Sequence, residues 1–221
     1  MQTFDTPAPI SAVVEIPAGR VQFIAADRAD TTVEVRPADA ASGRDAKAAR
    51  QITTGFADGV LRISAEPGSR LLGGAGSVEL TIQLPAGSRV EAKAATVEFR
   101  AVGRLGDVTL DSPHATVKID EAATARLTTL DGNVSVGRLG GAAEIRTGRG
   151  DITIAEARGG ALVLRTADGS ISVDAAAGVP AALDAGTTHG RIRNSLRNGD
   201  GAAGLIIHAT TDRGDITARS R

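Results

Sequence analysis

Cysteine, tryptophan and tyrosine are absent from this 221-residue sequence, and four phenylalanines are its only aromatic residues. The absence of cysteine excludes disulfides, thiol nucleophiles and thiolate metal sites. Because aromatic residues make up only 2% of the chain, the core must be aliphatic, and the aromatic platforms on which many sugar-binding sites rest are missing. The composition therefore disfavours both thiol chemistry and carbohydrate binding.

Long apolar runs and an excess of charge are absent too. No stretch approaches the roughly 18 consecutive apolar residues of a membrane-spanning helix. The N-terminus shows no basic segment followed by an apolar one, which is the pattern of a secretory signal. The net charge of −1 at pH 7 gives no attraction for nucleic acid or an anionic membrane. We therefore expect a cytoplasmic protein that neither inserts into membranes nor binds nucleic acid.

The chain does contain a short repeat of glycine, a polar residue, a β-branched residue, a polar residue and an apolar residue. Its copies are Gly132–Val136, Gly150–Ile154, Gly169–Val173 and Gly214–Ala218, with Ala115–Ile119 as a version that begins with alanine and Gly190–Asn194 as a degraded one. We call the first residue of each copy its anchor. The anchors recur after roughly twenty residues, a period that is typical of stacked-repeat proteins.

A second pattern precedes each anchor. The residue three positions earlier carries a hydroxyl, and the residues five and seven positions earlier are apolar. Because these offsets share one parity, the side chains lie on one face of a strand. We expect the hydroxyls to turn inward at a corner of the chain and to satisfy buried backbone groups there. They belong to Ser112, Thr129, Thr147, Thr166, Thr187 and Thr211.

Each repeat thus predicts two short strands with one apolar row apiece, which cannot be buried by one repeat alone. Parallel stacking of the repeats encloses a continuous core. We therefore predict an all-β fold, namely a short single-stranded parallel β-helix (a β-solenoid), right-handed because parallel crossovers favour that hand. The expected parts are an antiparallel N-terminal β cap region over residues 1–94 and solenoid repeats over residues 95–221, joined as one cooperative unit.

Turn signals divide the region before the repeats. Asp58-Gly59 indicates a hairpin, because both residues tolerate positive φ. Residues 43–51 are rich in alanine and charge, which favours a short helix or a loop. Gly68–Gly76 is rich in glycine and predicts an exposed loop. The alternation from Val78 to Leu84 places four apolar side chains on one face of a strand.

Several of these segments carry a resemblance to a known family. They are Phe4-Asp5-Thr6-Pro7, Val33–Pro37, Val78–Leu80, Leu84–Ser88 and the serial Gly-Asp-Ile repeats. In their order along nearly the whole chain, they resemble a bacterial β-strand-repeat family of unknown function, often described as a "putative adhesin" family. The resemblance implies a single-stranded β-helix of modest length. It implies no catalytic or ligand-binding residue, because the family has none established.

Charged residues stand immediately before several anchors. Asp131, Arg149 and Asp168 are expected to be vertical neighbours in the stack, where their alternating signs favour the register. Arg149-Gly150-Asp151 and Arg213-Gly214-Asp215 both spell the integrin-binding tripeptide, but each coincides with the corner of a repeat. We interpret both as parts of the repeat rather than as receptor sites.

No metal or cofactor site is predicted. His114 and His189 share a column but stand several coils apart, and His208 falls on an outward row, so the three histidines cannot share an ion. Gly73-Gly74-Ala75-Gly76 lacks the Lys-Ser/Thr of a phosphate-binding loop. The tandem nine-residue pattern of calcium-binding β-rolls is missing as well.

Catalytic groups are not gathered by any motif. Glycoside hydrolysis needs two carboxylates at a fixed separation, and no Gly-x-Ser-x-Gly nucleophile elbow is present. We therefore predict that the protein is not an enzyme, with no catalytic residue; a β-helix enzyme would need a deep pocket that gathers Asp, Arg and His. The carboxylates considered are Asp107, Asp151, Asp168, Asp184 and Asp215.

The regular polar rows favour a non-enzymatic scaffold or protein-interaction module that docks a protein partner or another copy of itself. Asn194, Ala209 and Ala218 thin the core of the last coils, which are therefore expected to fray unless something covers them. Arg219 and Arg221 supply charge there but little cover. The alternative hypothesis is an extracytoplasmic adhesin or glycan-binding module.

Overall fold

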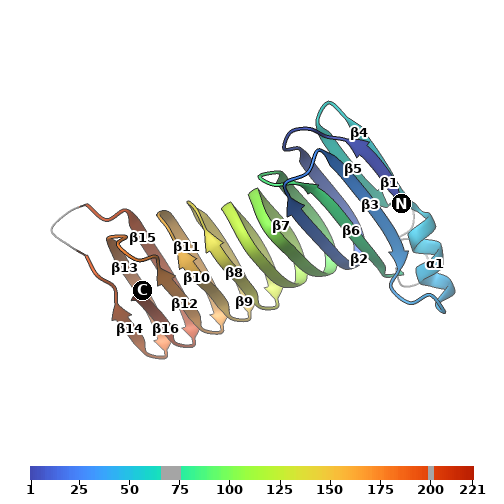
Figure 1. Cartoon of the computed structure of the whole chain (residues 1–221). Helices are drawn as coiled ribbons and strands as arrows, with labels where there is room; N and C mark the ends of the chain where they lie inside the picture. The colour runs from blue at the N-terminus through green and yellow to red at the C-terminus, as the bar shows by residue number, and fades with distance from the viewer. Residues whose placement is uncertain (66–75, 199–201) are drawn as a thin grey trace.

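The structure, a computed structural model, describes residues 1–65, 76–198 and 202–221. Its strands wind into a rod of stacked coils, with a broader sheet and a short helix at the N-terminal end (Figure 1). Apart from Gly76, the predicted loop Gly68–Gly76 lies outside the described residues. The elements are β1(Gln2–Asp5), β2(Ser11–Ala26), β3(Asp30–Pro37), α1(Gly43–Arg50), β4(Ile52–Ala57), β5(Val60–Ala65), β6(Val78–Pro85), β7(Arg89–Asp131), β8(Val134–Leu139), β9(Ala143–Arg149), β10(Ile152–Ala157), β11(Gly160–Asp168), β12(Ile171–Ala175), β13(Ala181–His189), β14(Ile192–Ser195), β15(Leu205–Arg213) and β16(Ile216–Ser220).

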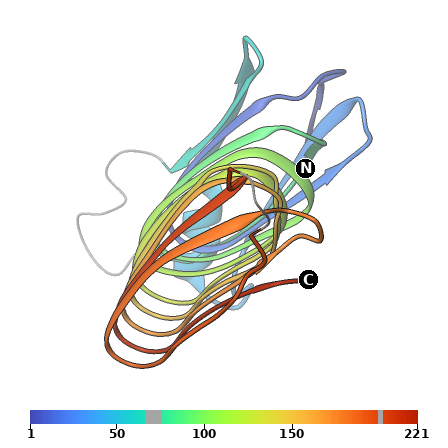
Figure 2. The same ribbon diagram turned by 90° about the vertical axis from the view of Figure 1, so that its left-hand side faces the viewer.

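Each coil of the rod contributes one strand to each of two faces. On the first face β9 pairs in parallel with β11, and on the second face β8 pairs with β10 and β10 with β12. A view along the rod shows these coils as flattened rings, one behind the other (Figure 2). The predicted all-β fold with parallel, solenoid-like stacking is therefore confirmed. The right-handed sense stays a prediction.

The predicted apolar columns form the core. Val134, Ile152 and Ile171 stand in register on neighbouring strands, and each is at most 1% exposed. On the first face Ile145 and Leu164 are in register and fully buried in the same way. The aliphatic composition therefore reflects stacking of like side chains, which fills the interior without large rings.

Corners of the coil explain the anchor glycines and the hydroxyl ladder. Gly150 has φ +140°, and a Cβ atom there would lie 2.2 Å from the carbonyl oxygen of Gly132 in the preceding coil. The Thr147 hydroxyl donates to that same Gly132 oxygen at 3.3 Å, and the Thr166 hydroxyl donates to the Gly150 oxygen at 3.0 Å. The threonines thus bind corner carbonyls, as the sequence predicts.

A further ladder at the corners was not foreseen. The side chain directly after the anchor accepts a hydrogen bond from the backbone of the next coil. Asn133 Oδ1 accepts from the Asp151 N–H at 2.9 Å, and Asp151 Oδ1 accepts from the Ser170 N–H at 2.8 Å. Asp215 Oδ1 accepts from the Arg191 N–H at 2.9 Å. Short Asp and Asn side chains suit this task because they reach nearby backbone donors.

The coils do not stack in the order of the sequence. Strands β15 and β16, which we call the inserted coil, lie between the coil of β11 and β12 and the coil of β13 and β14. Thus β15 pairs with both β11 and β13, and β16 pairs with both β12 and β14. We call β13 and β14 the outer coil, because they end the stack of described strands (Figure 1).

This order overturns part of the expectation for the last coils. Ala209 and Ala218 belong to the inserted coil, and they are 0% and 1% exposed because strands cover them on both sides. Arg219 lies in the same inserted coil and Arg221 follows it, and both donate hydrogen bonds to Asp174 of β12. Only Asn194 belongs to the outer coil, where all of β14 is exposed. The weakly covered coil is therefore residues 181–195, and it precedes the last repeat in sequence.

The N-terminal cap is mixed rather than antiparallel. Strands β1, β3 and β6 pair antiparallel, as do β4 and β5. However, β2 runs parallel to β5, β6 and β7. It pairs with β7 from Ser11 to Ala25 and thereby forms a complete coil. The predicted boundary at residue 94 falls inside β7; the division into two parts stays a prediction.

Local signals in the cap are borne out. Residues 43–51 include helix α1, which Ser42 caps by accepting the Asp45 N–H. Asp58 and Gly59 have φ of +52° and +73° in the hairpin between β4 and β5. The four apolar side chains predicted on β6 are buried.

No helix of the described residues is long and apolar enough to cross a lipid bilayer.

Candidate functional site

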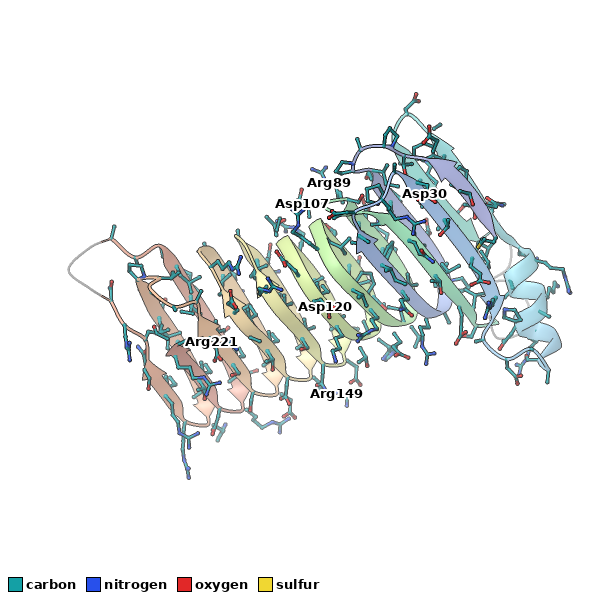
Figure 3. The ribbon with its side chains drawn as sticks, in the orientation of Figure 1. Asp30, Arg89, Asp107, Asp120, Arg149 and Arg221 are labelled. Carbon is teal, nitrogen blue, oxygen red and sulfur yellow. The ribbon has the colours of Figure 1, made fainter. Side chains whose placement is uncertain are left out.

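A hollow of about 620 Å³ lies on the first face near the junction of cap and rod, where Figure 3 labels Arg89 and Asp107. Its floor is formed by successive passes of β7 and by β9. Small side chains, including Thr124 and Ala142, leave this space open. The hollow is a concavity among the described residues that can be considered as a ligand site.

The charges in this hollow have partners, and Glu91 is paired with Lys93 at 3.5 Å. Arg89 pairs with Asp107 at 2.9 Å, and Thr124 donates a hydrogen bond to the same carboxylate at 2.8 Å. Arg126 pairs with Glu144 at 2.6 Å across neighbouring strands. With its acids and bases paired and no aromatic wall, the hollow presents neither a free charge nor a stacking surface for a ligand.

The carboxylates considered from the sequence do not converge. Asp107 lies in the hollow, and Asp151 belongs to the corner ladder. Asp168 pairs with Arg213 at 2.9 Å, and Asp184 lies 3.2 Å from His208 Nδ1. Asp215 accepts the Arg191 N–H. Each is thus engaged separately, and no pair of them forms an acid and a base facing one space.

The histidines are separated as well. His189 is in register with Arg213, and His208 is in register with Asp184 on the outward row of β15. His114 lies in β7, several coils away from both. Within the described ranges, no three His, Asp or Glu side chains come close enough together to hold a metal ion.

The two Arg-Gly-Asp segments are built into the corners. Arg149 donates to Asp131 at 3.0 Å, and Figure 3 places it at the edge of the rod. Asp151 accepts the Ser170 N–H, so both charged members of this segment already have partners. Arg213 donates to Asp168, which makes the predicted column of alternating charge continue through the inserted coil.

Asp174 is a buried carboxylate that sequence analysis missed. It is 5% exposed and receives two hydrogen bonds from Arg219, at 2.8 and 2.9 Å, and a third from Arg221 at 3.3 Å. The hydrogen bond from Arg219 is the main cause that lowers the pKa of Asp174, although burial opposes it. We call this cluster the arginine clasp. It fastens the inserted coil to β12.

The outer coil is the largest departure from the otherwise sealed core. Along one column of the second face, Ile152, Ile171 and Ile216 are at most 1% exposed, whereas Ile192 of β14 is 45% exposed. On the first face Leu183 is half-buried, although its neighbour Ile207 is fully buried. Apolar core side chains therefore face the end of the rod.

Backbone groups are also uncovered at this end. Among the described strands, β13 pairs with β15 alone and β14 with β16 alone, so each has an open edge, which on β13 begins after Ala181, whose N–H donates to the Arg197 carbonyl. The carbonyl of Pro180 accepts the Leu205 N–H, and the carbonyl of Arg191 accepts the Ile216 N–H. Because backbone groups alternate along a strand, those of Leu183, Ala185, Ile192 and Asn194 point away from the rod.

At the other end of the rod β1 and β4 are the outermost strands, and each likewise pairs with one strand only. There Phe4 of β1 contacts Phe56 of β4 with ring centroids 5.6 Å apart. Helix α1 lies beside β3 and β6 at the same end (Figure 1). The two ends thus differ in their side chains: the N-terminal end carries the aromatic contact and α1, whereas the outer coil leaves Ile192 of a core column 45% exposed.

These features define a class of protein: an all-β, solenoid-like repeat protein built from parallel stacked coils. The chain belongs to the Toastrack DUF4097 family, whose sequence profile matches residues 13–220. The resemblance to a β-strand-repeat family of unknown function is therefore confirmed. A search of curated proteins gives no match.

Solved structures that match this chain come from several bacteria. One is described as a "putative adhesin" from Bacteroides fragilis, with 13% identity, coverage of 98% of this chain and 95% of that one, and a TM-score of 0.48. Another is a "putative cell adhesion protein" from Clostridium sporogenes, with 13% identity, coverage of 100% and 98%, and a TM-score of 0.35. A "putative adhesin" from Parabacteroides distasonis has 12% identity, coverage of 98% and 95%, and a TM-score of 0.37.

Proposed function

We propose that the protein is a non-enzymatic scaffold that associates with a second copy of itself, end to end, through the outer coil. The single observation that carries this proposal is the exposure of core groups at one end of the rod. Ile192 is 45% exposed although the isoleucines before it in the same column are sealed. Unpaired strand edges with exposed apolar side chains are templates for pairing with another chain.

A second copy is the occupant that fits both edges together. The outer coil presents two open strands, β13 and β14, separated by the width of the coil. A single peptide strand would complete one of them and leave the other unpaired. An identical outer coil has the same width and the same two strands, so it satisfies both edges at once, as closed two-fold dimers require.

Matched isoleucine variants test this proposal. Ile192 faces the open end, whereas Ile206, which is 42% exposed, lies on the outward row of the inserted coil. Sedimentation equilibrium over a range of concentrations is expected to show a dimer for the natural protein and for Ile206→Asp. The Ile192→Asp variant is expected to be a monomer, because a charge then faces the contact. A natural protein that stays monomeric throughout the range would refute the proposal.

The competing hypothesis of an extracytoplasmic adhesin or glycan-binding module makes a different prediction. It requires export and affinity for a carbohydrate, and the paired charges of the hollow offer such a ligand little. We retain the cytoplasm as the proposed compartment, on the sequence argument alone. Fractionation of the native cell distinguishes the two hypotheses, since protein in the cell-wall fraction would favour the adhesin.

A further inference from the structure

A row of hydrogen-bond donors crosses four neighbouring strands on the outer side of the first face. Arg146 of β9 is in register with Arg165 of β11. The row continues to Thr128 of β7 on one side and to Thr210 of β15 on the other. All four side chains are exposed, because the residues before and after each of them are buried in the core. We call these four residues the donor row, which runs along the rod.

The positive charge of the donor row exceeds the negative charge that is paired with it. Glu144 is shared between two arginines, since its Oε2 lies 2.6 Å from Arg126 Nη1 and its Oε1 lies 2.5 Å from Arg146 Nη2. Among the described residues, no carboxylate forms an ion pair with Arg165. Three neighbouring arginines are therefore paired with a single carboxylate.

Arg146 and Arg165 are like charges placed side by side. Their strands are adjacent, so their backbones lie about 4.8 Å apart. Like charges at neighbouring positions of a sheet are destabilising. The corner column of the same strands differs, because Arg149 and Arg213 there are paired with aspartates. Local departures of this kind are expected at functional sites, and a bound anion would remove the repulsion.

We propose that the donor row binds a chain of linked phosphate groups that lies along the rod, with Arg146 and Arg165 as its main contacts. Guanidinium groups form strong, charge-assisted hydrogen bonds with phosphate oxygens. The hydroxyls of Thr128 and Thr210 can donate to further oxygens at the two ends of the row. Beside the arginines, Gly148 and Ala167 are small and leave the guanidinium groups accessible. The row lies on the side of the rod, so this inference does not depend on the end-to-end association proposed above.

Linked phosphates fit the spacing of the row better than an acidic peptide does. In an extended peptide, side chains on one side recur after two residues, or about 6.6 Å. The row presents a donor on every strand, at intervals of about 4.8 Å, and linked phosphates carry anionic oxygens on every unit. A nucleotide base would find no aromatic side chain to stack on, because the four phenylalanines pair with one another elsewhere. Recognition therefore rests on the phosphates alone.

Calorimetric titration with inorganic tripolyphosphate tests the site. The natural protein is expected to bind it at low ionic strength, with an affinity that falls as salt is added. The double variant Arg146→Gln with Arg165→Gln is expected to bind about tenfold or more weakly. A nucleoside triphosphate is expected to bind the natural protein within about threefold of tripolyphosphate, and poly-glutamate is expected to bind more weakly than either.

The matched control is Arg138→Gln with Arg158→Gln. These arginines are each 50% exposed on the second face and pair with Glu121 at 3.3 Å and with Glu156 at 2.7 Å. Their removal changes the net charge by the same amount, but it is expected to leave the affinity for tripolyphosphate within about threefold of the natural value. Equal losses in the two double variants would refute the site, because binding would then follow net charge alone.

Three further results would overturn the proposal. A natural protein that does not bind tripolyphosphate at low ionic strength has no such site. A nucleoside triphosphate that binds more than about tenfold tighter than tripolyphosphate, or poly-glutamate that binds as tightly, would refute recognition of phosphates alone. Finally, Arg165→Gln is expected not to lower the urea midpoint of unfolding in the absence of phosphate, since Arg165 adds repulsion without an ion pair. A lowered midpoint would give Arg165 a structural role instead.

Discussion

Each position of the repeat performs one physical task. The anchor glycine allows the corner to approach the preceding coil, and the Asn or Asp after it binds the backbone of the following coil. The β-branched residue then fills the core, and the threonine before the corner binds a buried carbonyl. These tasks recur because every coil meets the same neighbours, so one local solution serves along the rod.

A glycine comparison tests the corner. The change Gly150→Ala places a methyl group 2.2 Å from the Gly132 oxygen at φ +140°, and we expect a loss of about 3 kcal/mol in the free energy of unfolding. Gly55→Ala in β4 meets nothing within 4 Å and is expected to change it by less than about 1 kcal/mol. Urea titration measures both. Equal losses would contradict the role assigned to the corner.

A neighbouring pair tests the assignment of faces. Ile152 is fully buried, so Ile152→Asp leaves an unpaired charge in the core and is expected to cost more than about 4 kcal/mol of stability. Thr153 is exposed on the outer row, and Thr153→Asp is expected to cost about 0.5 kcal/mol or less. Chemical unfolding followed by circular dichroism measures the loss of stability in each variant. Similar damage from both would show that the faces are misassigned.

At the scale of elements, the arginine clasp fixes where the inserted coil lies. Arg219 and Arg221 of the last coil reach Asp174 on β12, and Arg213 reaches Asp168 on β11. All of these contacts join segments more than forty residues apart in sequence. They favour the inserted coil, rather than the outer coil, as the neighbour of β11 and β12.

The clasp predicts a dependence of stability on pH. Because Arg219 lowers the pKa of Asp174 in the folded protein, the ionised clasp stabilises the fold above the ordinary carboxyl pKa of about 3.9. That contribution is lost as the pH falls through the lowered pKa. Below about pH 4 we therefore expect stability to fall more steeply in the natural protein than in Asp174→Asn. Thermal unfolding between pH 2 and pH 6 (roughly the relevant window) measures this slope.

A matched background isolates the interaction. In a chain that carries Arg219→Gln and Arg221→Gln, the carboxylate of Asp174 has lost the donors that lower its pKa. Burial alone then raises that pKa, so adding Asp174→Asn to that chain is expected not to flatten its acid slope. If the substitution still flattens the slope as much as it does in the natural protein, the clasp is not its source.

The sequence predicted the columns but not the order of the coils. Val134, Ile152 and Ile171 follow from periodicity, because residues at one offset of a repeat share one environment. The segments beginning at Gly190 and Gly214 both satisfy that periodicity, so either order of stacking agrees with the pattern. The choice depends on distant contacts such as Arg213 with Asp168. The exposed end of the core is therefore at Ile192 of the outer coil and not, as expected from the sequence, at Ala218.

The direction of the strands in the cap could not be predicted from local sequence patterns either. The alternation of apolar residues along β2 agrees with the burial of its side chains. Alternation is the same for parallel and antiparallel partners, so it could not show that β2 runs parallel to β5, β6 and β7. The arginine clasp was missed for a related reason, since Asp174 and Arg219 become neighbours only through the inserted coil.

At the scale of the whole molecule, the two ends of the rod differ. The N-terminal end carries antiparallel strands and α1, whereas the outer coil leaves the core side chain of Ile192 45% exposed. Association through the outer coil would place the two caps at the far ends of a longer rod. The outer coil should therefore be the least protected part of a single copy.

Hydrogen exchange tests that asymmetry. At concentrations where the protein is monomeric, backbone amides of residues 181–195 are expected to exchange faster than those of residues 205–220. The reason is that β15 and β16 have partners on both sides and the outer coil does not. Raising the concentration is expected to slow exchange in 181–195 selectively. Faster exchange in 205–220 would contradict the observed order of coils.

The order of the coils is tested most directly by paired cysteines, since the natural chain contains none. Arg165 is in register with Thr210 on the neighbouring strand, and Gly186 lies one strand further away, in register with Thr210 from the other side. Cross-linking with a short bifunctional thiol reagent is expected to join Arg165→Cys with Thr210→Cys readily within one chain. The pair Arg165→Cys and Gly186→Cys is expected to join slowly. If the second pair is joined faster than the first, the coils stack in sequence order and the outer coil is not residues 181–195.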